Sequence, residues 1–134
     1  MTLKIRVIAP DRTVWNAEAE EVILPSSTGQ LGILTGHIPL LTALDIGVMR
    51  VRIDKDWIPI VLLGGFAEVE NNIITILVNG AEEGSDINVE TAQINLEEAI
   101  SMLAEAATSK EKIEATQKVR KARARVQAAQ ISNN

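Results

Sequence analysis

The chain of 134 residues has no cysteine and no tyrosine, and it has only one phenylalanine, two tryptophans and one histidine. Without cysteine it can form no disulfide and offers no thiolate to a metal ion. With one histidine, a metal site would depend on carboxylates for its other ligands, so we expect no metal centre and no cofactor. Hydrophobic residues still make up 46% of the chain, which predicts a packed core of aliphatic side chains.

Long hydrophobic runs are missing as well. The longest run, residues 58–67 (IPIVLLGGFA), is far shorter than the roughly 20 residues that a membrane-spanning helix needs. The first ten residues, MTLKIRVIAP, lack the basic-then-apolar pattern of a secretory signal. We therefore expect a soluble protein or one bound at the periphery of a membrane. A net charge of −5 and a pI near 4.9 argue against a general nucleic-acid binder.

Basic residues are absent from a long middle segment. From residue 57 to residue 108 there is no lysine or arginine, while acidic residues recur. The sign reverses in the next segment, which carries Lys110, Lys112, Lys118, Arg120, Lys121, Arg123 and Arg125. This reversal predicts that the C-terminal segment has a binding partner of its own.

Residues 1–80 show the two-residue alternation of β-strands. Leu3, Ile5 and Val7, for example, alternate with polar residues. The predicted strands cover residues 3–7, 21–24, 48–53, 57–63, 66–70 and 74–78, with a break or bulge at Gly64-Gly65 and a turn at Asn71-Asn72. Short strands without intervening helices favour a small β-sandwich or flattened barrel.

The pattern changes to a helical one near residue 84. Asn88 is the expected cap of a helix of roughly 20 residues, and Ser109 is the expected cap of a second helix. The first predicted apolar stripe is Leu96, Ile100, Leu103 and Ala107, and the second is Ala115, Val119, Ala122, Val126 and Ala129. The two stripes predict an antiparallel hairpin, with attraction between an acidic and a basic helix and a frayed tail at 131–134.

The expected fold is therefore α+β, with a flattened β-sandwich at residues 1–84 and a C-terminal two-helix hairpin at residues 85–134. The hairpin stripes consist mostly of alanine, and burial contributes only about 25 cal/mol per Å² of apolar surface. Isolated helices of this length are barely stable in water. We therefore expect the hairpin to be an arm that can exist in two states.

The single histidine, His37, lies in a segment with glycine at positions 29, 32 and 36. Catalysis would require an acid or nucleophile partner, and the nearest acid in sequence is Asp45. We therefore expect no catalytic site and interpret the segment as a surface loop. Its exposed tip would be Leu31, Ile33 and Leu34, and exposed apolar residues of this kind mark an interface.

Other catalytic and binding motifs are not found. The sequence has no phosphate-binding G-x-x-x-x-G-K-[ST] run and no G-x-S-x-G elbow. Glu82, Glu83 and Asp86 lack the spacing of a calcium loop and are expected to form a solvated connector. The basic run 118–125 admits three interpretations, which are a solvated helix face, an arm that grips an acidic protein surface, and a nucleic-acid site.

The layout and several motifs resemble the epsilon subunit of F-type ATP synthases along nearly the whole chain. The motifs are VILP (22–25), GQLGIL (29–34), Gly36-His37, PLLTA (39–43), GVMR (47–50), Gly64-Gly-Phe66 and ITILV (74–78). The runs DRTVW (11–15) and VRKARARV (119–126) are similar to the photosynthetic branch, from a cyanobacterium or a plastid. The resemblance implies a peripheral location at the thylakoid membrane, on its stromal or cytoplasmic side.

In that family the sandwich clamps the gamma subunit and rests on the ring of c subunits. The segment that resembles the ring contact is Gln30, Leu31, Gly32, Ile33, Leu34, Thr35, Gly36 and His37. Many relatives carry an acid where Gln30 stands, so the resemblance implies a less electrostatic contact. A charge at Leu31 or Ile33 is expected to uncouple ATP hydrolysis from proton pumping.

The resemblance also implies a role for the arm: it lies folded against the sandwich, or it extends along gamma into the alpha/beta catalytic head and slows ATP hydrolysis. The inhibitory residues implied by the resemblance are Lys118, Arg120, Lys121, Arg123 and Arg125. Several bacterial relatives bind ATP through an Ile-Asp-x-x-Arg-Ala motif, which corresponds here to Ile87, Asn88, Thr91 and Ala92. Asn88 replaces the acid and Thr91 replaces the arginine, so we expect weak or no ATP binding.

The favoured function is thus a non-catalytic rotor subunit that couples proton flow to ATP synthesis and restrains hydrolysis. The expected partners are gamma, the c-ring and the catalytic head, without nucleic acid. The alternative is an autonomous β-domain adaptor whose basic arm binds an acidic ligand or nucleic acid. Co-purification with a gamma subunit separates these two functions.

Overall fold

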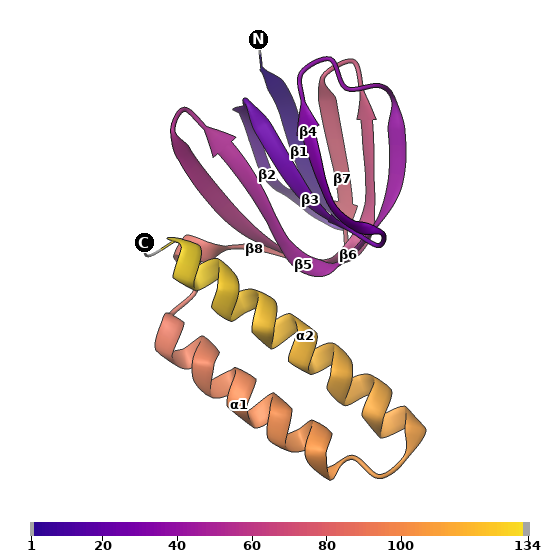
Figure 1. The fold of residues 1–134 in the computed structure, drawn as a ribbon, viewed down its shortest axis with the longest axis vertical. Helices are drawn as coiled ribbons and strands as arrows, with labels where there is room; N and C mark the ends of the chain where they lie inside the picture. The colour runs from indigo at the N-terminus through magenta and orange to yellow at the C-terminus, as the bar shows by residue number, and fades with distance from the viewer. Residues whose placement is uncertain (1, 133–134) are drawn as a thin grey trace.

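A computed structural model describes residues 2–132, and its strands precede its helices along the chain (Figure 1). The strands are β1 (Leu3–Ala9), β2 (Arg12–Ala19), β3 (Glu21–Ser26), β4 (Gly29–Leu34), β5 (Leu40–Ile53), β6 (Asp56–Glu70), β7 (Ile73–Val78) and β8 (Ala81–Glu83). A 3-10 turn η1 (Gly84–Asp86) leads to α1 (Val89–Glu105) and α2 (Ser109–Ser132). The predicted α+β class, a β domain followed by a two-helix hairpin, is confirmed.

The strands form one sheet that folds onto itself as a flattened sandwich. Their order is β2-β1-β7-β6-β5-β3-β4, with β8 paired to β6. The β1–β7 pair is parallel. The two longest strands, β5 and β6, pair over 13 positions, and the pairing is irregular only where Asp45 and Gly64 lie between paired neighbours. Both strands bend there and take part in both layers (Figure 1).

The Gly64-Gly65 pair makes that bend possible. Both residues have positive φ, +80° at Gly64 and +146° at Gly65, which side-chain-bearing residues rarely adopt. A Cβ atom at Gly65 would lie 2.0 Å from the carbonyl oxygen of Leu77 on β7. The sheet therefore needs glycine at this position, and the predicted irregularity is a bend within β6 rather than its end.

The core between the layers is aliphatic. Alternate residues of β1 (Leu3, Ile5, Val7) and of β7 (Ile74, Ile76) are fully buried, as the alternation predicts. The other buried members come from β2 to β7 and are Val, Leu, Ile, Met and Ala. This core contains no helix residue among those that the structure describes, so the β domain has an interior of its own.

Three strands were missing from the sequence-based expectation, and one of them is the short β8, whose residues were expected to form a solvated connector. β2 is an edge strand with mostly exposed or half-exposed residues, so it lacks a clear apolar alternation. β4 contains Gly29 and Gly32, and it was expected to be a loop. Burial shows that it is a strand, since Ile33 is fully buried while its neighbours on either side are exposed.

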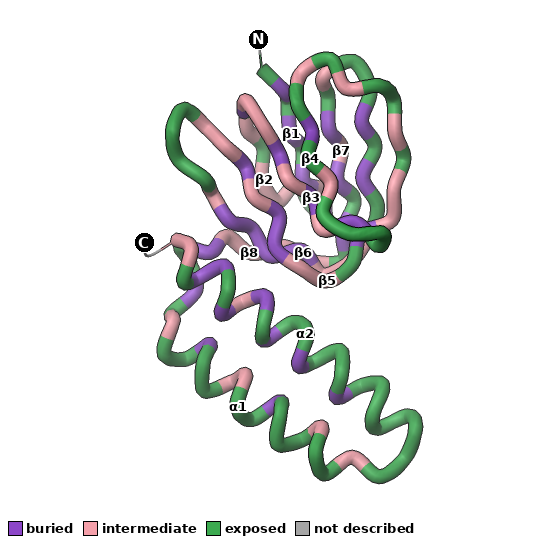
Figure 2. The backbone as a smooth tube through the Cα atoms, viewed as in Figure 1, coloured by how far each residue is buried: buried purple, intermediate pink, exposed green. Residues whose placement is uncertain are grey.

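The helical hairpin attaches to the outer surface of the sandwich through α2. Figure 1 shows α2 between the sandwich and α1, and the hydrophobic clusters agree. The C-terminal part of α2 buries Ala124, Val126 and Ala128 against Val48 of β5 and Val61 of β6. Figure 2 shows α1 largely exposed, because it packs mainly against α2.

The helix stripes were predicted with unequal success. All five predicted residues of α2 are buried, namely Ala115, Val119, Ala122, Val126 and Ala129. In α1 the inward residues are Ala92, Leu96, Ala99 and Leu103, whereas Ile100 is 45% exposed and Ala107 lies beyond the helix. The α1 stripe therefore uses alanine at two positions where larger apolar residues were available nearby in the sequence.

Side-chain hydrogen bonds to the backbone fix where both helices begin. The Asn88 side-chain oxygen accepts from the backbone N–H of Thr91 at 2.9 Å, which confirms the predicted cap. The second helix is capped by Thr108 rather than Ser109, since the hydroxyl oxygen of Thr108 accepts from the N–H of Glu111 at 3.1 Å. At the C-terminus α2 continues to Ser132, and the rest of the predicted frayed tail lies outside the described residues.

Candidate functional site

The predicted contact segment, residues 30–37, is an edge strand followed by a turn. Gln30, Gly32 and Leu34 are exposed, and Leu34 has 54% of its surface accessible. Leu31 packs partly against the core, and Ile33 has no accessible surface. The expectation of an exposed tip at Leu31, Ile33 and Leu34 is therefore wrong for Ile33 and holds only for Leu34, because strand geometry points alternate side chains inward.

The outward face of this segment is weakly charged and partly held in place. Gln30 accepts a hydrogen bond from Arg50 of β5 at 3.0 Å between Nη2 and Oε1. At the other end, the N–H of Gly36 donates to the side-chain oxygen of Asn72 at 2.7 Å. These two bonds tie the ends of the segment to β5 and to the turn between β6 and β7, so it offers a fixed surface rather than a flexible loop.

His37 lies in the turn after β4 and is half-exposed. Its backbone N–H donates to the carbonyl of Leu34 at 3.2 Å, and its Nδ1 lies 2.7 Å from the carbonyl oxygen of Ile38. The recorded contacts of His37 are thus with backbone groups of its own turn. Between residues 2 and 132, no group of histidine and acidic side chains is arranged to hold a metal ion.

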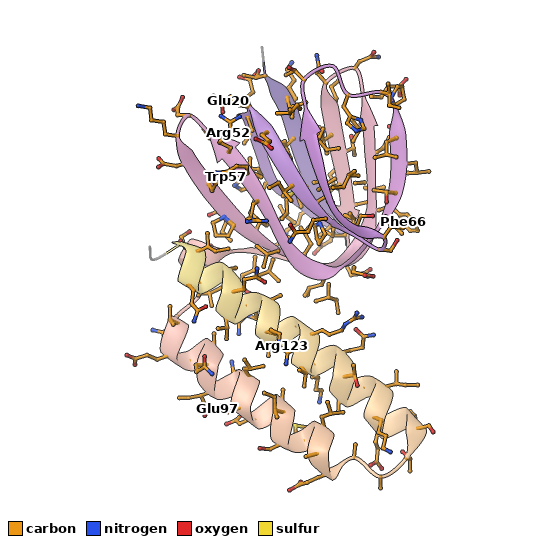
Figure 3. The ribbon with its side chains drawn as sticks, viewed as in Figure 1. Glu20, Arg52, Trp57, Phe66, Glu97 and Arg123 are labelled. Carbon is orange, nitrogen blue, oxygen red and sulfur yellow. The ribbon has the colours of Figure 1, made fainter. Side chains whose placement is uncertain are left out.

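An apolar row crosses the outer face of the sheet on β5, β6, β7 and β1, and its two central residues are exposed. Phe66 is 56% exposed and Leu77 is 53% exposed, and they lie opposite each other on β6 and β7. Ala43 pairs with Phe66 on one side, and Ile8 pairs with Leu77 on the other. Figure 3 shows Phe66 on the outside of the sandwich. We call these four residues the outer row. Sequence reasoning missed it.

The basic residues of α2 differ in their surroundings. Lys118, Arg120, Lys121 and Arg123 are exposed, and no ion pair or hydrogen bond is recorded for them within residues 2–132. Figure 3 places Arg123 on α2 and Glu97 on α1. The expected attraction between the helices therefore does not take the form of ion pairs in the described part of the chain. Apolar contacts hold α1 and α2 together.

Arg125 is the basic residue of α2 that has a partner in the β domain. Its Nε lies 2.9 Å from Oε2 of Glu82, and its Nη2 lies 3.1 Å from Oε1 of the same carboxylate. This two-point hydrogen bond raises the pKa of Arg125 above its ordinary value, against a smaller opposing effect of burial. Glu82 was expected to belong to a solvated connector, and its pairing with a residue 43 positions away has no signal in the sequence.

The neighbouring acid of the connector, Glu83, has a partner within the β domain. Glu83 accepts a hydrogen bond from the indole N–H of Trp15 at 2.7 Å, which ties β8 to β2. The carboxylates of Glu82 and Glu83 therefore serve two different partners, one in the arm and one in the β domain.

The altered nucleotide motif has a structural use in this chain. Ile87 and Ala92 are buried beside α2, and Asn88 caps α1 through the N–H of Thr91. Thr91 itself is exposed. The four positions thus form the start of α1 and its contact with α2, without the acid and the arginine of the bacterial motif.

Two family models match this chain almost end to end. The β-sandwich domain of the ATP synthase delta/epsilon chain matches residues 2–84, and the long α-helix domain of the same chain matches residues 85–130. None of the helices within residues 2–132 is both long and apolar enough to cross a membrane.

The chain is similar to curated epsilon chains over 96% of its length. It is 76% identical over 129 residues to the chloroplastic ATP synthase epsilon chain of Pyropia yezoensis, covering 96% of that relative. It is 61% identical over 132 residues to the ATP synthase epsilon chain of Thermosynechococcus vestitus, also covering 96%. A chain of the Euglena gracilis mitochondrial ATP synthase (OSCP/F1/c-ring, rotational state 1) has the same fold, with a TM-score of 0.82 at 20% identity, 96% coverage of this chain and 81% of that chain.

Proposed function

This chain belongs to the ATP synthase delta/epsilon chain family, as a non-catalytic subunit of the central stalk, and we propose that its β domain and its arm have separate tasks there. The β domain transmits rotation between the proton-driven ring and the catalytic head. The arm restrains ATP hydrolysis. The observation that carries this function is the match of both family models along residues 2–130.

The ring of c subunits is the proposed partner of residues 30–37. The strand geometry supports a contact through alternate residues, since Gln30, Gly32 and Leu34 are exposed and Gln30 and Leu34 carry the side chains. Gln30 offers an amide where many relatives have an acid, so this contact depends more on shape and apolar burial than on charge. His37 would belong to the same surface without a chemical role.

The gamma subunit is the proposed partner of the outer row. Phe66 and Leu77 are each more than half exposed and lie opposite each other on adjacent strands. Exposed apolar rows of this kind are usual at permanent protein–protein contacts. Pairing of the row across four strands also gives it the stiffness needed to transmit torque.

The proposed inhibitory role of the arm is supported by its exposed positive charge. Lys118, Arg120, Lys121 and Arg123 face solvent in the docked arm, so they are available to an acidic surface of the catalytic head. The arm meets the sandwich largely through small side chains of α2, so undocking loses little buried area. The extended arm would add Arg125 to the same contact.

The chloroplastic and cyanobacterial type of the relatives places the complex at the thylakoid membrane. The chain would be peripheral there, on the stromal or cytoplasmic side, held by its partners.

Removal of residues 110–134 tests the inhibitory role. In a complex reconstituted with gamma and the catalytic head, the truncated chain should raise ATP hydrolysis severalfold. A matched variant of the full chain, with Gln at positions 118, 120, 121 and 123, should have the same effect without removing α2. Unchanged hydrolysis in both complexes would refute inhibition by the arm, and failure of the full chain to co-purify with gamma would favour the adaptor function.

A further inference from the structure

Within residues 2–132, the contact between arm and β domain contains one ion pair, at the strand from which the arm departs. Glu82 lies on β8, the last strand before η1 and α1. Arg125 lies in the C-terminal half of α2, next to the residues that pack on β5 and β6. The pair therefore joins α2 to β8, the strand that directly precedes the arm.

The geometry of this pair is that of a strong contact. Two N–H groups of one guanidinium reach the two oxygens of one carboxylate, at 2.9 and 3.1 Å. The side chains retain only 23% and 36% of their accessible surface, so water screens them less than an exposed pair. The other ion pair among residues 2–132, Arg52 with Glu21, lies within the β domain and has a single 3.4 Å contact.

We propose that Glu82 is an internal substitute for the acidic partner of the arm, and that release of Arg125 from Glu82 is the step that frees the arm. The inhibitory consequence of release rests on the proposed function, whereas the docking itself does not. In the docked state Glu82 occupies the guanidinium that the extended arm would offer to the head. The two contacts exclude each other because one planar guanidinium edge cannot bind two carboxylates at once.

The rest of the interface between α2 and the sandwich explains why one ion pair can decide whether the arm is docked. Its α2 residues are mainly alanine, including Ala124, Ala128 and Ala129, which each bury little apolar area. The other four basic residues of the arm have no recorded ion pair within residues 2–132. Arg125 is therefore the basic residue whose charge favours the docked state.

The test measures docking in the isolated full chain. The sequence has no cysteine, so Lys55→Cys and Lys110→Cys supply unique thiols for spin labels, one in the exposed β5–β6 turn and one in the exposed first turn of α2. Glu82→Gln keeps the size of the side chain and removes its charge. We expect it to raise the ratio of undocked to docked arm about tenfold, as the loss of a charged hydrogen bond does.

Glu83→Gln is the matched control. It makes the same change at the adjacent residue of β8, whose carboxylate contacts Trp15 instead of the arm. It should leave the distance distribution of the labels unchanged. Arg125→Glu should undock the arm as Glu82→Gln does, and the exchange Glu82→Arg with Arg125→Glu should restore docking.

Docking that is the same in Glu82→Gln as in the parent would overturn the proposal, and so would equal undocking by Glu83→Gln. A second readout separates the proposal from the inhibitory function. In the reconstituted complex, Glu82→Gln should lower ATP hydrolysis because more of the arm is free. An arm that undocks in the isolated chain while hydrolysis stays unchanged would uphold the Glu82–Arg125 contact and refute inhibition.

Discussion

At the scale of single residues, Ile33 and Leu34 are neighbours in β4 with opposite surroundings. Ile33 has no accessible surface and belongs to the core of the β domain. Leu34 is 54% exposed on the surface that we assign to the c-ring. The same substitution at these two positions therefore separates a structural effect from a contact effect.

Ile33→Asp should destabilise the fold by roughly 4 kcal/mol, because it buries a carboxylate without a partner. Leu34→Asp should leave the urea midpoint almost unchanged and instead reduce coupling between hydrolysis and proton pumping. Urea denaturation of the isolated chain and proton pumping by the reconstituted complex provide the two measurements. Normal coupling with Leu34→Asp would contradict the proposed ring contact.

The nucleotide motif is also decided by single residues. Because Asn88 and Thr91 replace the acid and the arginine, calorimetry should detect no ATP binding at micromolar affinity. The variant Asn88→Asp with Thr91→Arg should bind ATP more tightly than the parent, and its fold should be retained because Asp caps helices as well as Asn. Micromolar affinity in the unchanged chain would contradict the role given to these two positions.

Residue-scale prediction from the sequence succeeded where the cause is local. The cap at Asn88 and the buried stripe of α2 depend on near neighbours in the chain, and both were found. The partner of Arg125 was not found, because its position depends on how α2 lies against β8. The burial of Ile33 was missed because the flanking glycines suggested a loop.

At the scale of elements, the short turn η1 packs directly against the backbone of α2. A Cβ atom at Gly84 would lie 2.5 Å from the carbonyl oxygen of Ala128 and 2.8 Å from Cγ of Pro59. Gly84 is also buried. The docked position of α2 therefore requires a residue without a side chain in η1.

Gly84→Ala should push α2 away from the sandwich and destabilise docking by about 1–3 kcal/mol, the usual range for overpacking. Gly32→Ala is the matched control, since a Cβ atom at Gly32 meets nothing within 4 Å. Hydrogen exchange of the α2 amides measures the effect and should rise only in Gly84→Ala. Equal protection in the two variants would show that η1 does not set the position of α2.

At this scale, prediction from the sequence succeeded for elements in which one face is clearly more apolar than the other. Strands with a fully buried face, such as β1 and β7, were predicted because their alternation is strong. The edge strand β2 was missed because both of its faces are largely exposed. The α1 helix was predicted, but its face was misassigned at Ile100, since the larger apolar residues point to solvent and alanines point to α2.

At the scale of the whole molecule, the core of the β domain is separate from the apolar clusters that hold the arm. The core of the β domain contains strand residues, whereas the second cluster joins α2 to the outer surface of β5 and β6. Loss of the arm would expose Val48 and Val61 without opening the core of the sandwich. The fold class and the order of the parts were predicted from the sequence, but the seating of α2 on the sheet was not.

A chain that ends at residue 84 should therefore fold on its own. We expect native-like β circular dichroism and a cooperative thermal transition, with a lower midpoint because Val48 and Val61 become exposed. The full chain measured under the same conditions is the control. A shortened chain without a cooperative transition would show that the sandwich needs the arm to fold.

The free end of the hairpin gives the docked arm a mechanical property. The turn at residues 106–108 lies about 30 Å along α2 from Ala128, whereas Arg125 lies about 5 Å from Ala128 in the same direction, at 1.5 Å per residue. With the contacts at Ala128 as the pivot, a sideways force on that turn therefore acts with a moment arm about six times that of the Glu82–Arg125 contact. Drag or collision at the tip during rotation would open the Glu82–Arg125 contact far more readily than the same force applied near the root.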